Sequence, residues 1–130
     1  DFVLDPMPYG GVNGTLEALD MNVPVVTLVG RRHGERSSYS ILANLGVTQT
    51  LAESGTEYVE IAARLATDAA FKAEVKARIA AGLRISPLVD MDAHTRHLEQ
   101  AYLRALEERY PQAIDGLTAA APVRRITGAE

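Results

Sequence analysis

Hydrophobic and polar positions divide this chain into a first half with strand-like runs and a second half with helical spacing. Three short apolar runs, at 2–4, 25–29 and 47–51, predict strands. The middle run is continuous and rich in β-branched residues, which is typical of a parallel strand covered on both faces. Apolar residues recur at helical spacing over 15–22 and 37–45, so the pattern predicts the order β-α-β-α-β.

The second half, after Gly55, carries apolar residues only at helical spacing. It predicts helices around 58–65 and 71–79 and a long final helix over 92–109. The whole order predicts an α/β fold: the C-terminal half of a Rossmann-like domain, with three parallel strands and flanking helices, then a helical C-terminal segment. Such a sheet leaves an unpaired edge, and the chain starts inside a strand without an initiator Met. We therefore expect it to be a piece of a longer protein.

Composition narrows the class of protein without identifying it. The chain has 130 residues, of which 47% are hydrophobic and 23% charged, as in an ordinary globular domain. Its net charge of -4 argues against a domain-wide basic surface for nucleic acid, and the lack of Cys excludes disulfides and thiolate zinc sites. No apolar run approaches the ~18 residues that a membrane span needs. We expect a cytoplasmic protein that binds neither nucleic acid nor membrane.

The strongest candidate site is the segment Tyr-Gly-Gly-Val-Asn-Gly-Thr-Leu-Glu at 9–17. It follows the carboxyl end of a predicted strand and enters a helix, where open α/β sheets bind their ligands. Glycines let a ligand approach the backbone, and a helix start offers N–H groups to an anion such as a diphosphate. Side chains in this segment can add hydrogen bonds, including bonds from ribose hydroxyls to its glutamate. The candidate binding residues are Gly10, Gly11, Asn13, Gly14, Thr15 and Glu17.

A purely structural interpretation of the same segment stays open at this point. Gly and Asn are common turn residues, and Asn13 or Gly14 can serve as an ordinary N-cap. The segment has neither the Gly-Lys-Ser/Thr of a Walker A loop nor a clean G-x-G-x-x-G pattern.

A second polar loop, Arg-Arg-His-Gly-Glu-Arg-Ser-Ser at 31–38, follows the middle strand and lies on the same predicted rim. Its arginines can hold phosphate or sugar hydroxyls; the alternative is a solvated loop with Ser37 as an N-cap. His33 alone is weak support for a general base. No His and carboxylate pair has metal-ligand spacing, so we expect no metal site.

The longer pattern resembles a known family. The stretches 5–19 and 22–28 resemble the donor-site core of the O-linked N-acetylglucosamine transferase/SPINDLY family of GT-B glycosyltransferases, whose bacterial members often carry tetratricopeptide repeats. The likeness covers nearly everything from residue 2 to about 110. It continues through Gly30, Arg36, Ser40, Leu45-Gly46, Glu57-Tyr58, Ile61-Ala62, 65–68, Ser86-Pro87-Leu88, Leu98-Glu99 and Tyr102-Leu103.

The resemblance implies a role for the whole chain. Residues 1–110 become the C-terminal part of a nucleotide-sugar-binding domain with a closing C-terminal helix, and 111–130 a flexible tail. The glycine segment then binds the diphosphate of the donor, Glu17 grips the ribose, and Arg36 matches a family arginine.

The resemblance also implies the reaction. It is an inverting, metal-independent transfer of N-acetylglucosamine from UDP-GlcNAc to Ser or Thr of a protein acceptor, with no cofactor besides the donor. The resemblance places the catalytic base and the acceptor site in an N-terminal domain with helical repeats in front of it, and we expect both to lie outside this chain. We assign no catalytic residue and expect the chain alone to be inactive.

The glycine segment departs from the family pattern, which leaves two alternatives. Family members commonly have a Thr run, sometimes after His, where this chain has Val-Asn-Gly-Thr at 12–15, and Asp20 replaces a large aromatic residue. Asn-Gly here is closer to bacterial cytoplasmic N-glucosyltransferases. The alternatives are a related GT-B transferase with another donor, such as UDP-glucose to Asn, or a non-catalytic protein-interaction module with a degenerate site.

Overall fold

The structure is a computed structural model that describes residues 1–111. It divides into two compact units, Asp1–Met91 and a second that begins at Asp92. All but the first residue of the tail expected over 111–130 lies outside the described residues. The two units are described separately below.

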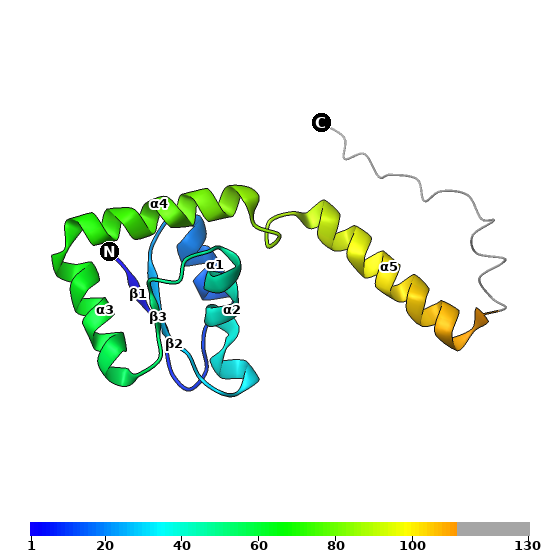
Figure 1. Cartoon of the computed structure of the whole chain (residues 1–130), viewed down its shortest axis with the longest axis horizontal. Helices are drawn as coiled ribbons and strands as arrows, with labels where there is room; N and C mark the ends of the chain where they lie inside the picture. The colour runs from blue at the N-terminus through cyan, green and yellow to red at the C-terminus, as the bar shows by residue number, and fades with distance from the viewer. Residues whose placement is uncertain (112–130) are drawn as a thin grey trace. The chain divides into compact units, whose positions relative to one another are not determined.

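The first unit is built on a parallel sheet with strands in the order β1 (Val3–Leu4), β2 (Val25–Leu28) and β3 (Leu51–Ala52) (Figure 1). β2 is the central strand, and three of its four residues are buried, as its continuous β-branched run predicts. The predicted class of three parallel strands with flanking helices, followed by helices, is confirmed.

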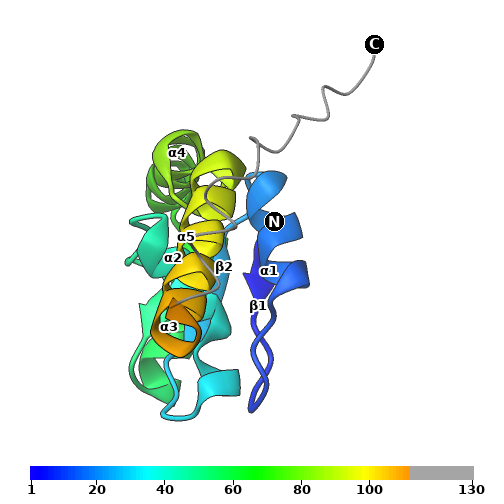
Figure 2. The ribbon, with the colours of Figure 1, turned by 90° about the vertical axis from the view of Figure 1, so that its right-hand side faces the viewer.

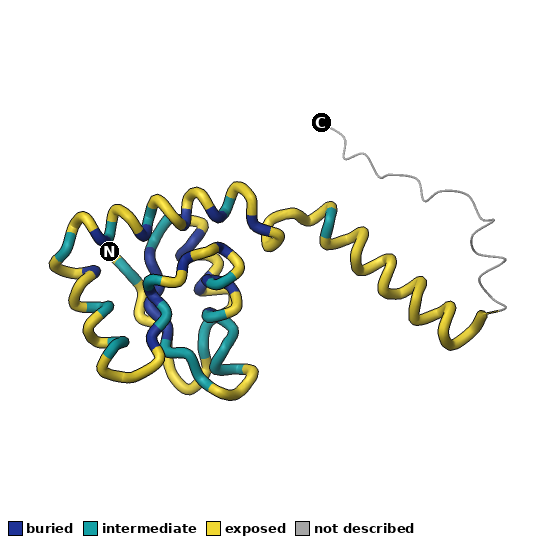
Figure 3. The backbone as a smooth tube through the Cα atoms, viewed as in Figure 1, coloured by how far each residue is buried: buried dark blue, intermediate teal, exposed yellow. Residues whose placement is uncertain are grey.

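Helices cover both faces of this sheet. α1 (Asn13–Asp20) and α2 (Ser37–Asn44) lie on one face, and α3 (Gly55–Thr67) lies on the other (Figure 1). α4 (Ala69–Ile85) crosses the end at which the strands begin. The core lies between these layers (Figure 3), and its fully buried apolar side chains are those of Leu19, Val25, Val26, Leu42, Val47, Ala52, Leu65, Val75 and Ile79.

The third strand is shorter and later than predicted. The apolar pattern predicted a strand over 47–51, but β3 shares only Leu51 with that range. Val47 donates its N–H to the Leu42 carbonyl at 2.9 Å, and Leu51 donates to Thr48 at 3.2 Å, so the chain between them forms turns. Val47 is nevertheless completely buried. An apolar residue can be buried in the core without pairing with a neighbouring strand, so its hydrophobicity does not distinguish a strand from a buried loop.

Asp68 separates α3 from α4, where the sequence showed a break between two helical faces. Its carboxylate accepts the Phe71 N–H at 2.9 Å, and its other oxygen lies 3.3 Å from Nε of Arg64. The bond from the Phe71 N–H, helped by the Arg64 guanidinium, holds the pKa of Asp68 below the usual aspartate value. Asp68 thus begins α4, and the Phe71, Val75 and Ile79 side chains of that helix are buried as predicted.

Among the described residues, the second unit is formed chiefly by α5 (Met91–Arg109), whose first residue still belongs to the first unit. Its bounds agree with the predicted helix over 92–109 to within one residue. The apolar side chains at i, i+4 and i+8, those of Leu98, Tyr102 and Leu106, are exposed. Within residues 1–111, no helix is both long and apolar enough to cross a membrane.

α4 reaches the end of α2 through a backbone contact at Gly82. A Cβ at this position would lie 2.3 Å from the Leu45 carbonyl oxygen, although Gly82 is in a helix, where Gly is otherwise unfavourable. Four residues on, Ser86 Oγ donates to the Asn44 carbonyl at 3.3 Å. The close approach therefore requires a residue without a side chain.

We predict that Gly82→Ala destabilises the first unit by about 1–3 kcal/mol, because α4 must move away from the Leu45 carbonyl. Chemical denaturation measures this loss. Gly55→Ala is the matched control: Gly55 is also helical, but its Cβ would meet no atom within 4 Å. Equal stability of the two variants would contradict the close-packing argument.

Candidate functional site

Two loops leave the carboxyl ends of β1 and β2 at the same end of the sheet (Figures 1 and 2). We name residues 5–12 the glycine loop and residues 29–36 the arginine loop. The Gly10 N–H donates to the Gly34 carbonyl at 3.0 Å, which joins the two loops directly. The prediction that both loops share one rim of the sheet is confirmed.

The Asp5 side chain binds the glycine loop to the sheet. It follows β1, is only 5% exposed, and its two carboxylate oxygens have different partners. Oδ1 accepts the Gly11 N–H at 2.7 Å, and Oδ2 accepts the Thr27 hydroxyl at 2.7 Å. A buried carboxylate is costly unless its oxygens accept such bonds, so this side chain fixes the loop against the central strand.

The first two glycines of the loop are closely surrounded by polar side chains, so that a Cβ at either position would be crowded. A Cβ at Gly10 would lie 3.0 Å from Oδ2 of Asp5, and one at Gly11 would lie 2.8 Å from Oγ1 of Thr15. Gly10 and Gly11 therefore have a structural reason to be glycine, independent of any ligand.

Ser38 holds the same loop from α2. It is 1% exposed, and its hydroxyl donates to the Gly11 carbonyl at 2.9 Å. Ser38 Oγ also lies 2.8 Å from Oγ1 of Thr15, which is 3% exposed. The Thr15 hydroxyl is thus bound to Ser38 inside the fold. Only the backbone of Thr15, in the first turn of α1, lies at the rim.

Tyr58 reaches the same point from the opposite face of the sheet. Its hydroxyl donates to the backbone carbonyl of Asp5 at 3.0 Å. Burial, and to a smaller extent the negative charge of Asp5, raises the pKa of Tyr58 above the usual tyrosine value. Tyr58 therefore keeps its proton and remains a donor throughout the physiological pH range.

The start of α1 is open to solvent. The helix begins at Asn13, two residues before the predicted start, and the residue in front of it is Val12, whose side chain provides no cap. The alternative of Asn13 or Gly14 as the N-cap is therefore wrong. The first bond of the helix runs from the Leu16 N–H to Val12, so the preceding N–H groups have no acceptor within the helix.

Three of the predicted binding residues are exposed on this turn. Asn13 and Glu17 are four residues apart on α1, and therefore lie on one side of the helix. Gly14 would have no atom within 4 Å of a Cβ, so neither packing nor backbone strain explains why it is glycine. The open space beside Gly14, unlike that beside Gly10 and Gly11, is available to a ligand.

The arginine loop is held in shape by Glu35. One carboxylate oxygen accepts the N–H of Arg31 at 2.9 Å and that of Arg32 at 3.1 Å. The bonds from Arg32 and Arg31 lower the pKa of Glu35, and the charge of Arg32 adds to this effect. Glu35 lies in a short 3₁₀ helix, η1 (His33–Glu35), just before α2.

Arg36 lies at the end of this loop and beside α2. Its Nη1 donates to the Gly30 carbonyl at 2.9 Å, and its guanidinium stacks on the Tyr39 ring at 4.3 Å. Because a guanidinium has five N–H donors, these contacts orient Arg36 without using all of them. α2 has no side-chain cap, so Ser37 does not play the capping role predicted for it.

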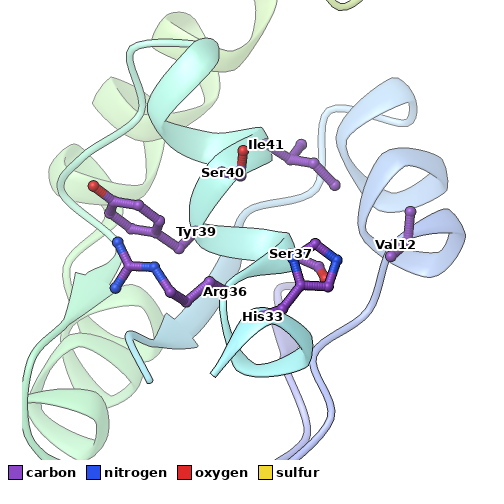
Figure 4. Close-up of a pocket in the computed structure, with 7 residues that line it drawn as sticks. All are labelled: Val12, His33, Arg36, Ser37, Tyr39, Ser40 and Ile41. Carbon is purple, nitrogen blue, oxygen red and sulfur yellow. The ribbon is translucent and has the colours of Figure 1, made fainter. Parts of the chain in front are cut away.

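A pocket of about 490 Å³ lies between the start of α1 and α2. His33 and Ser37 lie on the side of α2 that faces Val12, with Arg36 and Tyr39 farther around the helix (Figure 4). The lining residues are Val12, His33, Arg36, Ser37, Tyr39, Ser40 and Ile41. The pocket gives the rim a hollow beside the open helix start.

Sequence reasoning missed the two residues that hold the glycine loop, Asp5 and Ser38. The sequence pattern placed Asp5 at the start of the stretch that resembles the family and Ser38 in the polar loop at 31–38, and assigned neither a role in the site. One signal was available: Thr27 interrupts an otherwise apolar buried strand, and a buried hydroxyl needs a partner. The chain gives no indication that this partner lies 22 residues earlier.

The chemistry of the rim is that of anion and hydroxyl binding. Over the part of the chain that the structure describes, no group of three or more His, Asp or Glu could hold a metal ion. The described rim has an open helix start and an exposed glutamate on α1, and Arg36 lines the pocket farther around α2, with its guanidinium on the Tyr39 ring (Figure 4). Such a site suits a nucleotide diphosphate.

Comparison with known proteins identifies the family of the chain. Residues 1–98 match the family model described as Glycosyl transferase family 41. The chain belongs to this family, and the predicted resemblance to the O-linked N-acetylglucosamine transferase/SPINDLY family is confirmed.

Curated relatives include a probable UDP-N-acetylglucosamine–peptide N-acetylglucosaminyltransferase SPINDLY from Oryza sativa subsp. japonica, 37% identical over 110 residues. That match covers 85% of this chain and 12% of the relative. A UDP-N-acetylglucosamine–peptide N-acetylglucosaminyltransferase from Caenorhabditis elegans is 31% identical over 120 residues, which cover 91% of this chain and 10% of the relative. The chain thus spans about an eighth or less of these relatives' length.

A solved structure shares the fold. The O-GlcNAc transferase of Thermobaculum terrenum, in a mutant form, superposes with a TM-score of 0.72 at 36% sequence identity. The match covers 79% of this chain and 20% of that one.

We predict that the Glu35 carboxylate titrates below the ordinary glutamate range and that the Arg31 and Arg32 amide resonances report this titration. The lowered pKa means that Glu35 stabilises the arginine loop above the unfolded-state pKa, and that this stabilisation is lost as the pH falls through the folded-state pKa. An NMR pH titration measures it. Glu35→Gln is the control and should abolish the low-pH transition; a transition at the ordinary glutamate pKa in the unsubstituted protein would contradict the assignment.

Proposed function

We propose that this chain forms the donor-binding part of a glycosyltransferase that transfers N-acetylglucosamine from UDP-GlcNAc to Ser or Thr of a protein. The observation that carries the proposal is the open start of α1, with Asn13, Gly14 and Glu17 exposed, in a chain of glycosyl transferase family 41. The names of the relatives supply the donor and the class of acceptor.

In the proposed site, the N–H groups at the start of α1 bind the donor diphosphate. The partial positive charge at this end of the helix stabilises the negative charge that develops on the diphosphate as its bond to the sugar breaks. This stabilisation lowers the barrier to transfer. The Glu17 carboxylate accepts hydrogen bonds from the ribose hydroxyls, and Arg36 adds positive charge near the leaving group. Gly10, Gly11 and Thr15 contribute by fixing the loop that leads into this helix.

The proposed transfer is inverting and uses no metal. The acceptor hydroxyl attacks the anomeric carbon of the donor while the bond to the diphosphate breaks, and a base removes the hydroxyl proton. We assign no catalytic residue within this chain, so the base and the acceptor site come from elsewhere in the complete protein. We accordingly propose that residues 1–110 act as one part of a two-part enzyme, located in the cytoplasm, and that they have no activity alone.

Titration of UDP against the complete protein tests the donor site. We predict that Glu17→Ala weakens UDP binding roughly tenfold or more, because a charged acceptor for two hydroxyls is lost. Isothermal titration calorimetry gives the dissociation constants. Asp20→Ala is the matched control, since Asp20 is an exposed acid on the same helix, and should leave the constant unchanged.

Two results of this titration would contradict the proposal. Complete failure of the protein to bind UDP would favour the non-catalytic interaction module. Equal effects of Glu17→Ala and Asp20→Ala would remove Glu17 from the site. Hydrolysis assays with several UDP-sugars then identify the donor, and preference for UDP-glucose would favour the N-glucosyltransferase alternative.

Gly14 allows a second test that separates binding from folding. We predict that Gly14→Ala leaves stability unchanged or raises it by up to about 1 kcal/mol, because Ala is favoured over Gly in a helix. The added methyl group enters the open space beside the diphosphate and weakens UDP binding roughly tenfold. Calorimetry and thermal unfolding measure the two effects.

Gly55→Ala is the control for this substitution, because Gly55 also lies in the first turn of a helix with no atom near its Cβ position. It should change stability to a similar extent, because the same helix preference applies, but leave UDP binding unchanged. A Gly14→Ala variant with unchanged UDP affinity would exclude close approach of the diphosphate at this position.

A further inference from the structure

Gly11, the second glycine of the glycine loop, is held at both of its polar backbone atoms. Its N–H donates to Oδ1 of Asp5 at 2.7 Å, and its carbonyl accepts from Ser38 Oγ at 2.9 Å. The two side chains come from different elements, the end of β1 and the second residue of α2. Rotation of the Gly11 backbone therefore breaks a part-buried hydrogen bond on one side or the other.

The Asp5 contact sets the loop against the sheet. The carboxylate receives one bond from the loop and one from Thr27 on β2, so the loop position is tied to the central strand. Among residues 1–111, no cation forms an ion pair with Asp5. These two donors are therefore essential to it, and loss of either leaves a buried oxygen with one partner fewer.

The Ser38 contact ties the loop to the first turn of α1 as well. A serine hydroxyl has one proton, and Ser38 gives it to the Gly11 carbonyl. The 2.8 Å contact with Thr15 then requires the Thr15 hydroxyl to donate to Ser38. The direction of both bonds is thus determined: Thr15 donates to Ser38, and Ser38 donates to Gly11.

We infer that Asp5 and Ser38 are positioning residues of the donor site, which hold the glycine loop in the conformation that presents the start of α1 to a nucleotide diphosphate. Both are buried, whereas Asn13, Gly14 and Glu17 are exposed. They act on the ligand through Gly11 and Thr15 and do not touch it. The inference rests on the proposed donor-binding function.

Substitution of Ser38 in the complete protein tests this role. Ser38→Ala removes both bonds while leaving the rim groups in place, and should weaken UDP binding about tenfold. Thr15→Val removes only the bond from Thr15 to Ser38 and should weaken binding less, whereas Thr15→Ser keeps the hydroxyl and should restore affinity to near the wild-type value. In the Ser38→Ala background, Thr15→Val should have little further effect, because its partner is already absent.

The matched control is Thr50→Val. The Thr50 hydroxyl is also completely buried, but it makes no hydrogen bond in the described structure. Its removal should leave the UDP dissociation constant unchanged. Thermal unfolding of every variant shows the temperature range in which each is folded, and the binding constants are compared within that range.

The outcomes separate the two hypotheses. Failure of the wild-type protein to bind UDP overturns the proposed function, and this inference with it. UDP binding that is weakened by Glu17→Ala but unchanged by Ser38→Ala overturns the positioning role alone, and so does a Thr15→Ser variant no tighter than Thr15→Val. A fall in melting temperature with an unchanged binding constant assigns Ser38 a structural role only.

Asp5→Asn provides a second variant on the other side of the loop. The amide oxygen can still accept the Gly11 N–H, but the amide nitrogen cannot accept the Thr27 hydroxyl. We expect weaker UDP binding from a folded variant, and a wild-type constant would overturn the role of Asp5. If Asp5→Asn does not fold, Ser38→Ala and Thr15→Val still decide whether the loop contacts control affinity.

Discussion

The buried carboxylate of Asp5 is the interaction on which the arrangement of the rim depends. A carboxylate removed from water must find hydrogen-bond donors, and here they come from segments that are separate in the sequence: Gly11 in the loop and Thr27 on the central strand. The backbone carbonyl of the same residue accepts from Tyr58 on α3. The loop, the sheet and the helix on its other face therefore meet at one residue.

The contacts of Asp5 distinguish the glycine loop from the first turns of α1 that follow it. Its inner residues, Gly10 and Gly11, pack against Asp5 and Thr15, where a Cβ would be too close to polar oxygens. The turn that follows places Gly14 in open space and Glu17 on an exposed surface. Packing thus explains why Gly10 and Gly11 are glycine, whereas it does not explain Gly14, which keeps its place in the proposed donor site.

The sequence was sufficient for elements whose side-chain pattern has one explanation. The continuous apolar run of β2 is rich in β-branched residues, which favoured a strand covered on both faces, and the apolar residues of α5 recur at helical spacing. Val47 had two explanations, a strand or a buried loop, and the hydrogen bond from its N–H to Leu42 decides for the loop. Its hydrophobicity alone could not distinguish them.

The location of the candidate site could be predicted from the sequence, but the side chains that hold its loop could not. A glycine-rich segment between a strand and a helix defines where a ligand would bind, because topology alone brings that segment to the rim. The side chains that fix its shape are defined by contacts between residues far apart, such as the 27 positions between Gly11 and Ser38. A local pattern contains no information on such a contact.

Ser38 also links the two loops of the rim into a single unit. It stands on the helix that follows the arginine loop, yet its hydroxyl binds the glycine loop, and Gly34 accepts the N–H of Gly10 nearby. A displacement of the arginine loop would therefore strain the hydrogen bonds of Gly10 and Gly11. Through the contact between Ser38 and Thr15, it would also strain the first turn of α1. These bonds restrict the movement of the loops relative to the start of α1, and a preorganised set of N–H groups is what the proposed electrostatic site for a developing charge requires.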